Sequence, residues 1–150
     1  MAKVRVTKEF SFEMAHALEN YDGSCRHVHG HSYKLFVTVA GTPSANINDP
    51  KFGMVIDFGQ LKKIVNTNIV DRYDHALVLR ETSDNSELYY SIRAHFEKVE
   101  LVDYQPTCEN MIVRFSQVIS KELPLNVELY SLKLHETQTS YAEWYAQDNQ

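Results

Sequence analysis

Two long stretches of the chain alternate polar and apolar residues with a period of two, and this pattern limits the possible folds. Successive side chains of a β-strand point to opposite faces, so such alternation predicts strands with one buried face. The strand predicted over 3–16 has on its apolar parity Val4, Val6, Phe10, Phe12, Met14 and His16. The strand predicted over 29–39 has His29, His31, Tyr33, Leu35, Val37 and Val39. The short polar loop between the two strands predicts an antiparallel hairpin.

Helix signals follow this hairpin, after a loop rich in turn-forming residues over 41–53. Asp57 is predicted to cap a first helix, with Gln60 as its partner in a capping box. Thr107, directly after Pro106, is predicted to cap a second helix in the same way. Apolar residues recur at helical spacing behind both caps, so each helix should bury one side.

The remaining elements are shorter. Strands are predicted over 127–136 and 141–145 from their alternating patterns. The segment 80–105 is less regular: a short helix is predicted around Leu88, Ile92 and Phe96, followed by a strand over 99–102. This order of elements predicts an α+β fold, in which helices cover one face of an antiparallel sheet.

Composition sets outer bounds on function. A chain of 150 residues with 43% hydrophobic residues is expected to form one domain over 1–150. The net charge of −5 argues against broad binding to nucleic acids or anionic membranes. Two cysteines, Cys25 and Cys108, are too few for a disulfide framework. With no apolar signal core near the N-terminus and no long apolar run, the predicted location is the cytoplasm.

Three histidines lie on the apolar parity of the two predicted strands. His29 and His31 are two residues apart, so their side chains point the same way, and the hairpin would bring His16 opposite them. Three imidazoles with one open position are typical of a catalytic zinc site. The alternative is that these are core histidines with ordinary hydrogen-bond partners. His27 shares the parity of His29 and His31, so spacing alone leaves it as another candidate ligand.

Other polar residues are candidates for proton transfer or ligand binding. Cys25 precedes His29 by four residues, and a thiol beside a dication and Arg26 is a candidate base or nucleophile. Asp74 directly precedes His75, and a carboxylate that orients an imidazole is a common proton-transfer unit. Glu136 shares the apolar parity of the strand before it, so its carboxylate needs a partner, either a basic side chain or the N–H donors of a ligand. Cys108, in the first turn of the second helix, is interpreted as a packing residue.

Taken together, these motifs resemble the 6-pyruvoyl-tetrahydropterin synthase family, which includes the 6-carboxy-tetrahydropterin synthases of queuosine biosynthesis. The resemblance covers nearly the whole chain, with six motifs in the family's order. They are FSFEMAH (10–16), CRHVHGHSY (25–33), VIDFGQLK (55–62), YDHALVL (73–79), PTCEN (106–110) and LHETQTS (134–140).

The resemblance implies the T-fold and a zinc ion (Zn2+) held by the three histidines, with His27 outside the site. It implies a proton-transfer set, a pterin anchor at Glu136, and further ring contacts from Thr107 and Glu109. The proton-transfer set is Cys25, Asp74 and His75. The family commonly assembles as two stacked trimers, so a homohexamer with active sites between subunits is expected. A neighbouring chain would then bring Asp74 and His75 to Cys25.

The expected function is that of a zinc-dependent lyase, a 6-carboxy-tetrahydropterin synthase that acts on 7,8-dihydroneopterin triphosphate. The short gap between Cys25 and His29 favours this product over that of a 6-pyruvoyl-tetrahydropterin synthase, which is the alternative. A third alternative, a non-catalytic zinc- or pterin-binding protein, would not need Cys25, Asp74, His75 and Glu136. The stretch between Leu79 and Gln105 is longer than in compact members of the family. Candidates for binding the triphosphate, each of which could equally be a surface charge, are Arg26, Lys34 and Lys133.

Overall fold

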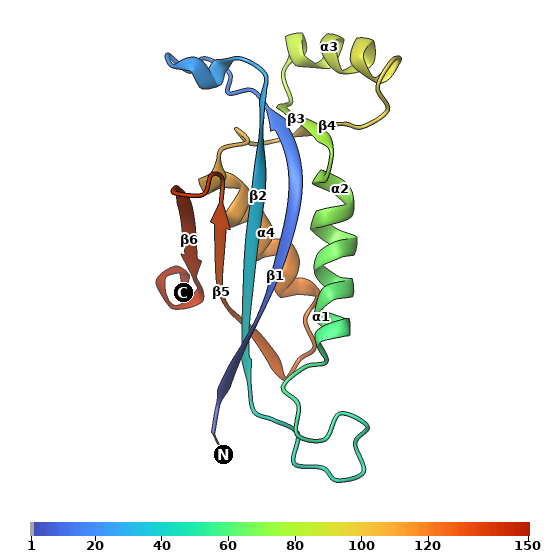
Figure 1. The fold of residues 1–150 in the computed structure, drawn as a ribbon, viewed down its shortest axis with the longest axis vertical. Helices are drawn as coiled ribbons and strands as arrows, with labels where there is room; N and C mark the ends of the chain where they lie inside the picture. The colour runs from blue at the N-terminus through green and yellow to red at the C-terminus, as the bar shows by residue number, and fades with distance from the viewer. Residues whose placement is uncertain (1) are drawn as a thin grey trace.

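A six-stranded sheet forms the centre of the computed structural model, which describes residues 2–150. Its strand order is β4-β3-β1-β2-β5-β6, and the long β1–β2 hairpin runs through the middle (Figure 1). The strands are β1 (Val4–His16), β2 (His29–Gly41), β3 (Ala76–Arg80), β4 (Val99–Val102), β5 (Val127–His135) and β6 (Tyr141–Tyr145).

The predicted hairpin is confirmed, and β2 extends two residues beyond the predicted end. β1 and β2 pair antiparallel without interruption, from Val4 opposite Gly41 to His16 opposite His29. The apolar parity is buried where the sheet is covered, and the rings of Phe12 and Tyr33 stack with centroids 5.1 Å apart. Burying a side chain of this size stabilises a fold by about 1.5–3 kcal/mol, so the core fixes which face of the hairpin points inward.

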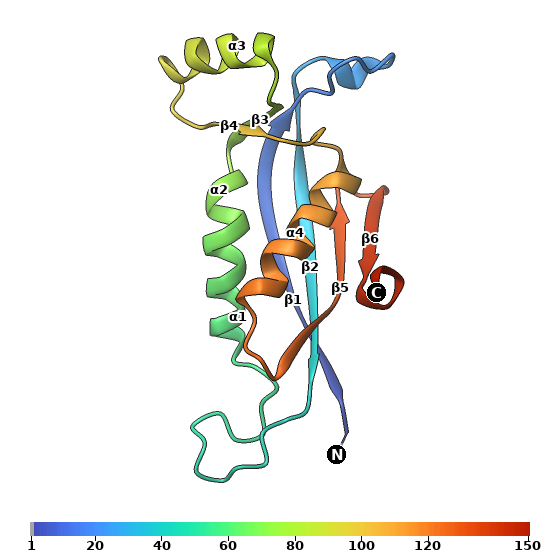
Figure 2. The same ribbon diagram turned by 180° about the vertical axis from the view of Figure 1, so that it is seen from behind.

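Two helical segments cover one face of the sheet, as predicted (Figures 1 and 2). Their buried side chains, such as Leu61 and Phe115, pack onto the inward face of the strands. A further helix, α3, stands apart at one end of the molecule and buries none of its residues. The helices are α1 (Phe58–Val65), its continuation through a π-helical turn (Asn66–Val70) into α2 (Asp71–Tyr73), α3 (Ser83–Arg93) and α4 (Cys108–Glu122), with 3-10 turns at Ser24–Arg26 and Ala146–Asn149.

Both predicted helix caps are confirmed, but the capping box is wrong. The Asp57 carboxylate accepts hydrogen bonds from the backbone N–H groups of Gly59 (2.6 Å) and Gln60 (3.3 Å). The Gln60 side chain does not reach back to the cap, because its Oε1 accepts a hydrogen bond from Lys51 Nζ at 2.7 Å. At α4, the Thr107 hydroxyl accepts from the backbone N–H of Asn110 at 3.2 Å.

The α+β class is confirmed, while the sheet is mixed rather than wholly antiparallel. β1, β2, β5 and β6 pair antiparallel, as predicted, but β3 was not predicted and pairs parallel to β1 and to β4. The predicted strand over 99–102 is confirmed as β4. The predicted helix before it lies at Ser83–Arg93, so Phe96 falls outside that helix.

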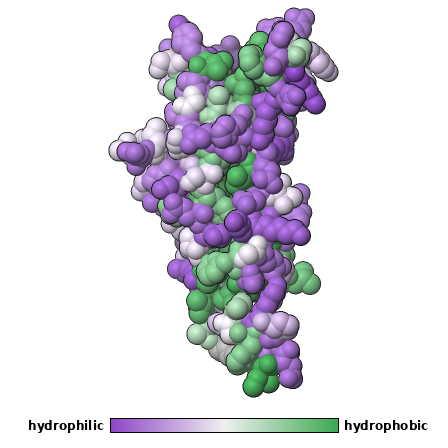
Figure 3. Space-filling view, turned by 45° about the vertical axis from the view of Figure 1, so that its right-hand side comes forward, coloured by the Kyte–Doolittle hydropathy of each residue, from purple (hydrophilic) through white to green (hydrophobic). Residues whose placement is uncertain are grey.

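The surface seen in Figure 3 is mostly polar, with apolar side chains gathered toward the two ends of the molecule. No helix within residues 2–150 is long and apolar enough to cross a membrane. The C-terminal end of β1, the start of β2, the start of α4 and the end of β5 meet at the end of the molecule where α3 lies. The predicted functional residues of these elements therefore lie in one region.

Candidate metal centre and adjoining cleft

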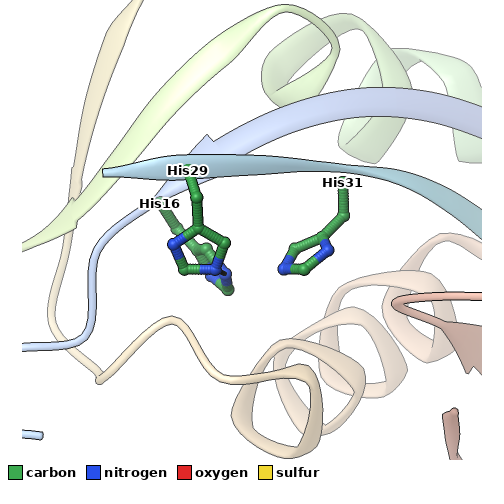
Figure 4. A group of neighbouring side chains, drawn as sticks. All are labelled: His16, His29 and His31. Atoms are coloured by element: carbon green, nitrogen blue, oxygen red, sulfur yellow. Dashed lines mark hydrogen bonds between the residues drawn. The ribbon is translucent and has the colours of Figure 1, made fainter. Parts of the chain in front are cut away.

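The three histidines of the hairpin converge on the inward face of the sheet, as their parity predicts (Figure 4). His16 ends β1 and lies directly opposite His29, the first residue of β2, and His31 follows on the same face. Their nearest ring nitrogens all lie within 4.8 Å of one another. The hairpin register alone therefore builds a group that could hold a metal ion.

Hydrogen bonds to two backbone carbonyl groups orient two of the three imidazole rings, those of His16 and His29. His16 Nδ1 lies 2.7 Å from the carbonyl oxygen of Pro106, and His29 Nδ1 lies 2.7 Å from that of His27. Because a carbonyl oxygen can only accept, both Nδ1 atoms must carry the proton. In the neutral rings each Nε2 is then a bare lone pair, free to bind a metal.

These two lone pairs point at each other. The Nε2 atoms of His16 and His29 are 3.1 Å apart, and neither neutral ring has a proton left to place between them. Two facing lone pairs repel each other unless a cation lies between them. Two nitrogens bound tetrahedrally to zinc at 2.0–2.1 Å would be about 3.3 Å apart. The observed separation therefore fits a shared metal ion.

Burial favours the neutral form that metal binding requires at two of the histidines, His16 and His31. It lowers the pKa of His16 to about 4, against a partly opposing effect of the Pro106 carbonyl, and the neighbouring His29 and His31 lower it further. Burial also lowers the pKa of His31, although the Glu136 carboxylate opposes this. His31 Nε2 is buried and has no hydrogen-bond partner among residues 2–150, with Glu136 Oε1 3.8 Å away.

His27, which spacing left as a candidate ligand, is not part of the group. It lies before β2 in an exposed position, and its ring nitrogen accepts a hydrogen bond from Arg26 Nε at 3.4 Å. Its contribution is its backbone carbonyl, which fixes the ring of His29. β2 begins at His29, so the alternation of side chains between the two faces does not extend back to His27. Its shared parity therefore did not predict the position of its side chain.

A cleft of about 410 Å³ adjoins the histidines and contains four of the other predicted site residues. Cys25 stands in the 3-10 turn of the β1–β2 loop, which is closed by a hydrogen bond from Leu18 N to the Cys25 carbonyl at 3.0 Å. The start of α4 and the end of β5 form the opposite wall. The full lining is Leu18, Glu19, Asn20, Tyr21, Cys25, Gln105, Thr107, Cys108, Glu109 and Glu136.

The cleft is acidic and rich in hydrogen-bond acceptors. Glu19, Glu109 and Glu136 line it, whereas no lysine or arginine of the described residues 2–150 does. Such a lining suits a ligand that presents N–H donors better than it suits a phosphate group. Sequence analysis did not identify Glu19 or Gln105, because neither lies in a motif and only the fold brings them here.

The three basic residues considered for triphosphate binding lie outside this cleft. Lys34 Nζ pairs with Glu9 at 3.0 Å, and Lys133 Nζ lies 3.9 Å from the centre of the Tyr141 ring. Arg26 contacts the exposed His27. Each cation therefore has a local surface partner, and none is directed at the cleft.

Asp74 and His75 face each other even though they are adjacent in sequence. Asp74 Oδ1 lies 3.0 Å from His75 Nδ1, because His75 adopts a left-handed backbone conformation with φ of 61°. Burial alone would raise the pKa of Asp74. The hydrogen bond from the Glu13 backbone N–H and the contact with His75 outweigh it and hold that pKa below its usual value.

Within one chain, this pair lies away from the cleft that contains Cys25. The His75 side chain is 76% exposed and lines a separate cavity of about 550 Å³. Glu13 and Ser32, from the polar parity of the hairpin, line the same cavity. The structure thus brings Cys25, Thr107, Glu109 and Glu136 to the histidines, but places Asp74 and His75 elsewhere.

Cys108 is a packing residue, as the sequence indicated. Its thiol is buried, and its Sγ donates to the carbonyl of Leu134 at 3.2 Å. Burial raises the pKa of Cys108 to about 12, so the thiol stays protonated at neutral pH. The dipole of α4 does not overcome this desolvation.

The chain is similar in sequence to known proteins. A family model described as 6-pyruvoyl tetrahydropterin synthase matches residues 5–147. The chain is 35% identical over 141 residues to the 6-carboxy-5,6,7,8-tetrahydropterin synthase of Haemophilus influenzae, covering 93% of this chain and 97% of that protein. It is 32% identical over 143 residues to the protein of the same name from Rickettsia typhi, covering 93% and 99%.

Solved structures show the same fold. The 6-pyruvoyl tetrahydropterin synthase of Caenorhabditis elegans superimposes with a TM-score of 0.69 at 23% identity, covering 97% of each chain. An uncharacterized protein of Wolinella succinogenes superimposes with a TM-score of 0.75 at 22% identity, covering 97% of this chain and 99% of that one. The predicted T-fold is therefore confirmed.

The histidine group generates a first prediction. Purified protein should contain about one metal ion per chain, because three protein ligands and one open position hold a single ion in catalytic zinc sites. His29→Ala removes one of the two facing lone pairs and should lose most of the metal, whereas the matched control His27→Ala should retain it. Elemental analysis by mass spectrometry measures both. Normal metal content in His29→Ala would show that the three histidines are not the ligands.

Proposed function

Since this chain belongs to the 6-pyruvoyl tetrahydropterin synthase family, we propose that it is a zinc-dependent 6-carboxy-5,6,7,8-tetrahydropterin synthase. In the proposed reaction, 7,8-dihydroneopterin triphosphate and water give 6-carboxytetrahydropterin, acetaldehyde and triphosphate, as a step of queuosine biosynthesis. The observation that carries the proposal is the group of three histidines beside an acceptor-lined cleft. Relatives that carry this name over nearly their whole length support it.

His16, His29 and His31 would hold the zinc ion. Three neutral imidazoles and an open position are the ligand set of catalytic zinc, and the facing Nε2 atoms fit it. When bound, the metal would polarise the side-chain oxygens of the substrate and acidify the neighbouring C–H bonds. The carbonyls of Pro106 and His27 would hold two of the rings ready for this ion.

Glu136 would anchor the pterin ring. Its carboxylate lies at the end of β5, lines the cleft and pairs with no lysine or arginine among residues 2–150. An ion pair, the structural alternative for this carboxylate, is thereby disfavoured. Two carboxylate oxygens match two parallel N–H donors at the edge of a pterin. Thr107 and Glu109 line the same cleft and would add contacts to the ring.

Cys25 would remove a carbon-bound proton as thiolate, and His75, oriented by Asp74, would return one. In a single chain these groups lie in different cavities. The proposed mechanism therefore requires a second copy of the chain, whose exposed His75 would complete the cleft containing Cys25. A homohexamer of two stacked trimers, with sites between subunits, would meet this requirement.

The short gap between Cys25 and His29 supports the 6-carboxy product over the 6-pyruvoyl product. Three residues separate the thiol from the first histidine of β2, and the loop is further closed by the Leu18–Cys25 hydrogen bond. This limits how far the thiolate can lie from the metal and which side-chain carbon it faces. The gap would thereby set the order in which protons are removed, and so whether the side chain is kept or cleaved.

The role of Cys25 predicts a specific defect. Cys25→Ala should retain metal and bind substrate but lose turnover by about 10²- to 10⁴-fold, the usual contribution of a positioned proton-transfer group. The control Ser24→Ala, in the same 3-10 turn, should keep turnover. Steady-state kinetics together with metal analysis measure the effect. Undiminished turnover in Cys25→Ala would remove the thiol from the mechanism.

Glu136 generates a prediction about affinity. Glu136→Gln replaces one acceptor oxygen with an amide that would face a ligand N–H, so pterin affinity should fall by at least about tenfold. Fold and metal content should be unchanged, and Glu122→Gln at the exposed end of α4 is the control. Calorimetric titration with a reduced pterin decides the question. Equal affinity in Glu136→Gln would assign this carboxylate another role.

The product distinguishes the two tetrahydropterin synthases. Incubation of the purified enzyme with 7,8-dihydroneopterin triphosphate should release acetaldehyde and triphosphate in equal amounts. An alcohol dehydrogenase coupled to NADH oxidation measures the aldehyde. If 6-pyruvoyl-tetrahydropterin accumulates and no acetaldehyde appears, the argument from the Cys25–His29 gap is wrong.

A further inference from the structure

The turn that contains His75 adopts a backbone conformation that few non-glycine residues adopt. Within residues 2–150, only Asn20 and His75 among the non-glycine residues have a positive φ. Histidine adopts this left-handed conformation more often than most residues, but it persists here because neighbouring groups fix it. At His75 this conformation also directs the imidazole toward Asp74.

The outer edge of β1 holds one side of this turn. The backbone N–H of Glu13 donates to Asp74 Oδ1 at 2.8 Å, and the backbone N–H of His75 donates to the Glu13 carbonyl. Glu13 thus contacts both members of the pair through its main chain alone. These two hydrogen bonds hold the turn against the edge of the sheet. They do not involve the carbonyl groups of Asp71 and Asp74, which lie on the other side of the turn.

Lys98 holds that other side. It directly precedes β4, at the end of the segment that joins β3 to β4, and it makes three hydrogen bonds there. Its Nζ donates to the carbonyl of Asp71 at 2.8 Å and also to the carbonyl of Asp74. Its own backbone carbonyl accepts from the N–H of Leu77 at 3.1 Å. Lys98 therefore contacts Asp74, directly before His75, and Leu77, two residues after it.

The ammonium group also suits this position electrostatically. Asp71 begins α2 and Asp74 is its C-cap, so both carbonyls lie in the last turn of the continuous helical segment from α1 to α2, where unpaired carbonyl oxygens concentrate negative charge. A cation there satisfies acceptors that the helix leaves free. It also lies close enough to Asp74 to favour the ionised carboxylate that faces His75.

We propose that Lys98 is a positioning residue for the Asp74–His75 pair. It would hold the turn at His75 through hydrogen bonds of both its side chain and its backbone. This inference rests on the proposed function only in so far as the pair takes part in the reaction. It also gives the long segment between β3 and β4 a role, since that segment ends by placing Lys98 against the turn. Loss of the ammonium group would let His75 leave the conformation in which Asp74 orients it.

The test is a double-mutant cycle on the full-length enzyme, assayed for acetaldehyde. In Lys98→Met, kcat should fall by about 10- to 100-fold, the scale of a misplaced proton-transfer group, while KM and the melting temperature change little. Lys98→Arg, which retains a donor, should recover most of the loss. In the His75→Ala background, Lys98→Met should cause no further loss. Lys51→Met is the control, because its Nζ also donates to a neutral oxygen (Gln60 Oε1, 2.7 Å). Lys51 belongs to the loop between β2 and α1, and this loop lies at the end of the molecule opposite α3 (Figure 1).

Two kinetic results would overturn the proposal. One is a kcat of Lys98→Met within about twofold of the wild type while His75→Ala is impaired. The other is a double variant in which the two losses multiply. A defect in His75→Ala of less than about twofold would instead remove the pair from the proposed function.

Hydrogen exchange decides the role of Lys98 independently of the reaction. The backbone amide of His75 should exchange about tenfold faster in Lys98→Met than in the wild type, and at the normal rate in Lys51→Met. Unchanged exchange at His75 in Lys98→Met would show that Lys98 does not hold the turn, whatever reaction the enzyme catalyses.

Discussion

The register between β1 and β2 is the constraint on which the candidate site depends, because it sets His16 opposite His29. A shift of one residue would turn the apolar side chains and histidines of one strand to the face opposite those of its partner. The stacked rings of Phe12 and Tyr33, and the fully buried Leu35, oppose such a shift. The apolar core of the hairpin therefore positions the three histidines that could hold a metal, with no loop conformation needed to bring them together.

The same hairpin presents different chemistry on its two faces. The inward face ends in three imidazoles beside a cleft lined by carboxylates, which suits a cation and a ligand rich in N–H donors. The outward face, through the backbone of Glu13, holds the turn that directs His75 at Asp74. A single chain cannot bring these two sets of groups to one substrate. Assembly of several chains is thus a chemical requirement of the proposed mechanism as well as a property expected from the family.

Much of this arrangement could be predicted from the sequence, because it depends on local patterns. Alternation placed His16, His29 and His31 on one face, and the caps at Asp57 and Thr107 were identified from short motifs. β3 (Ala76–Arg80) was not predicted, because a strand paired with parallel neighbours on both sides is buried on both faces and does not alternate.

Contacts between residues that are distant in the sequence could not be predicted either. Gln105 Nε2 donates to the Glu19 carbonyl across 86 residues, which no motif indicates. The orientation of His75 depends on a positive φ, which only a few per cent of non-glycine residues adopt and which no local motif here indicates. Sequence patterns could thus identify residues suited to metal binding or proton transfer. The partners that orient these residues became clear only from the fold.

In the proposed site, a metal ion lies between the Nε2 atoms of His16 and His29, which would otherwise repel each other. X-ray absorption spectroscopy at the zinc edge, on protein purified without added metal, tests this arrangement. We expect zinc with three imidazole nitrogens at about 2.0–2.1 Å and one oxygen ligand from water. An edge without zinc, or a first shell that contains sulfur or fewer than three imidazoles, would contradict it.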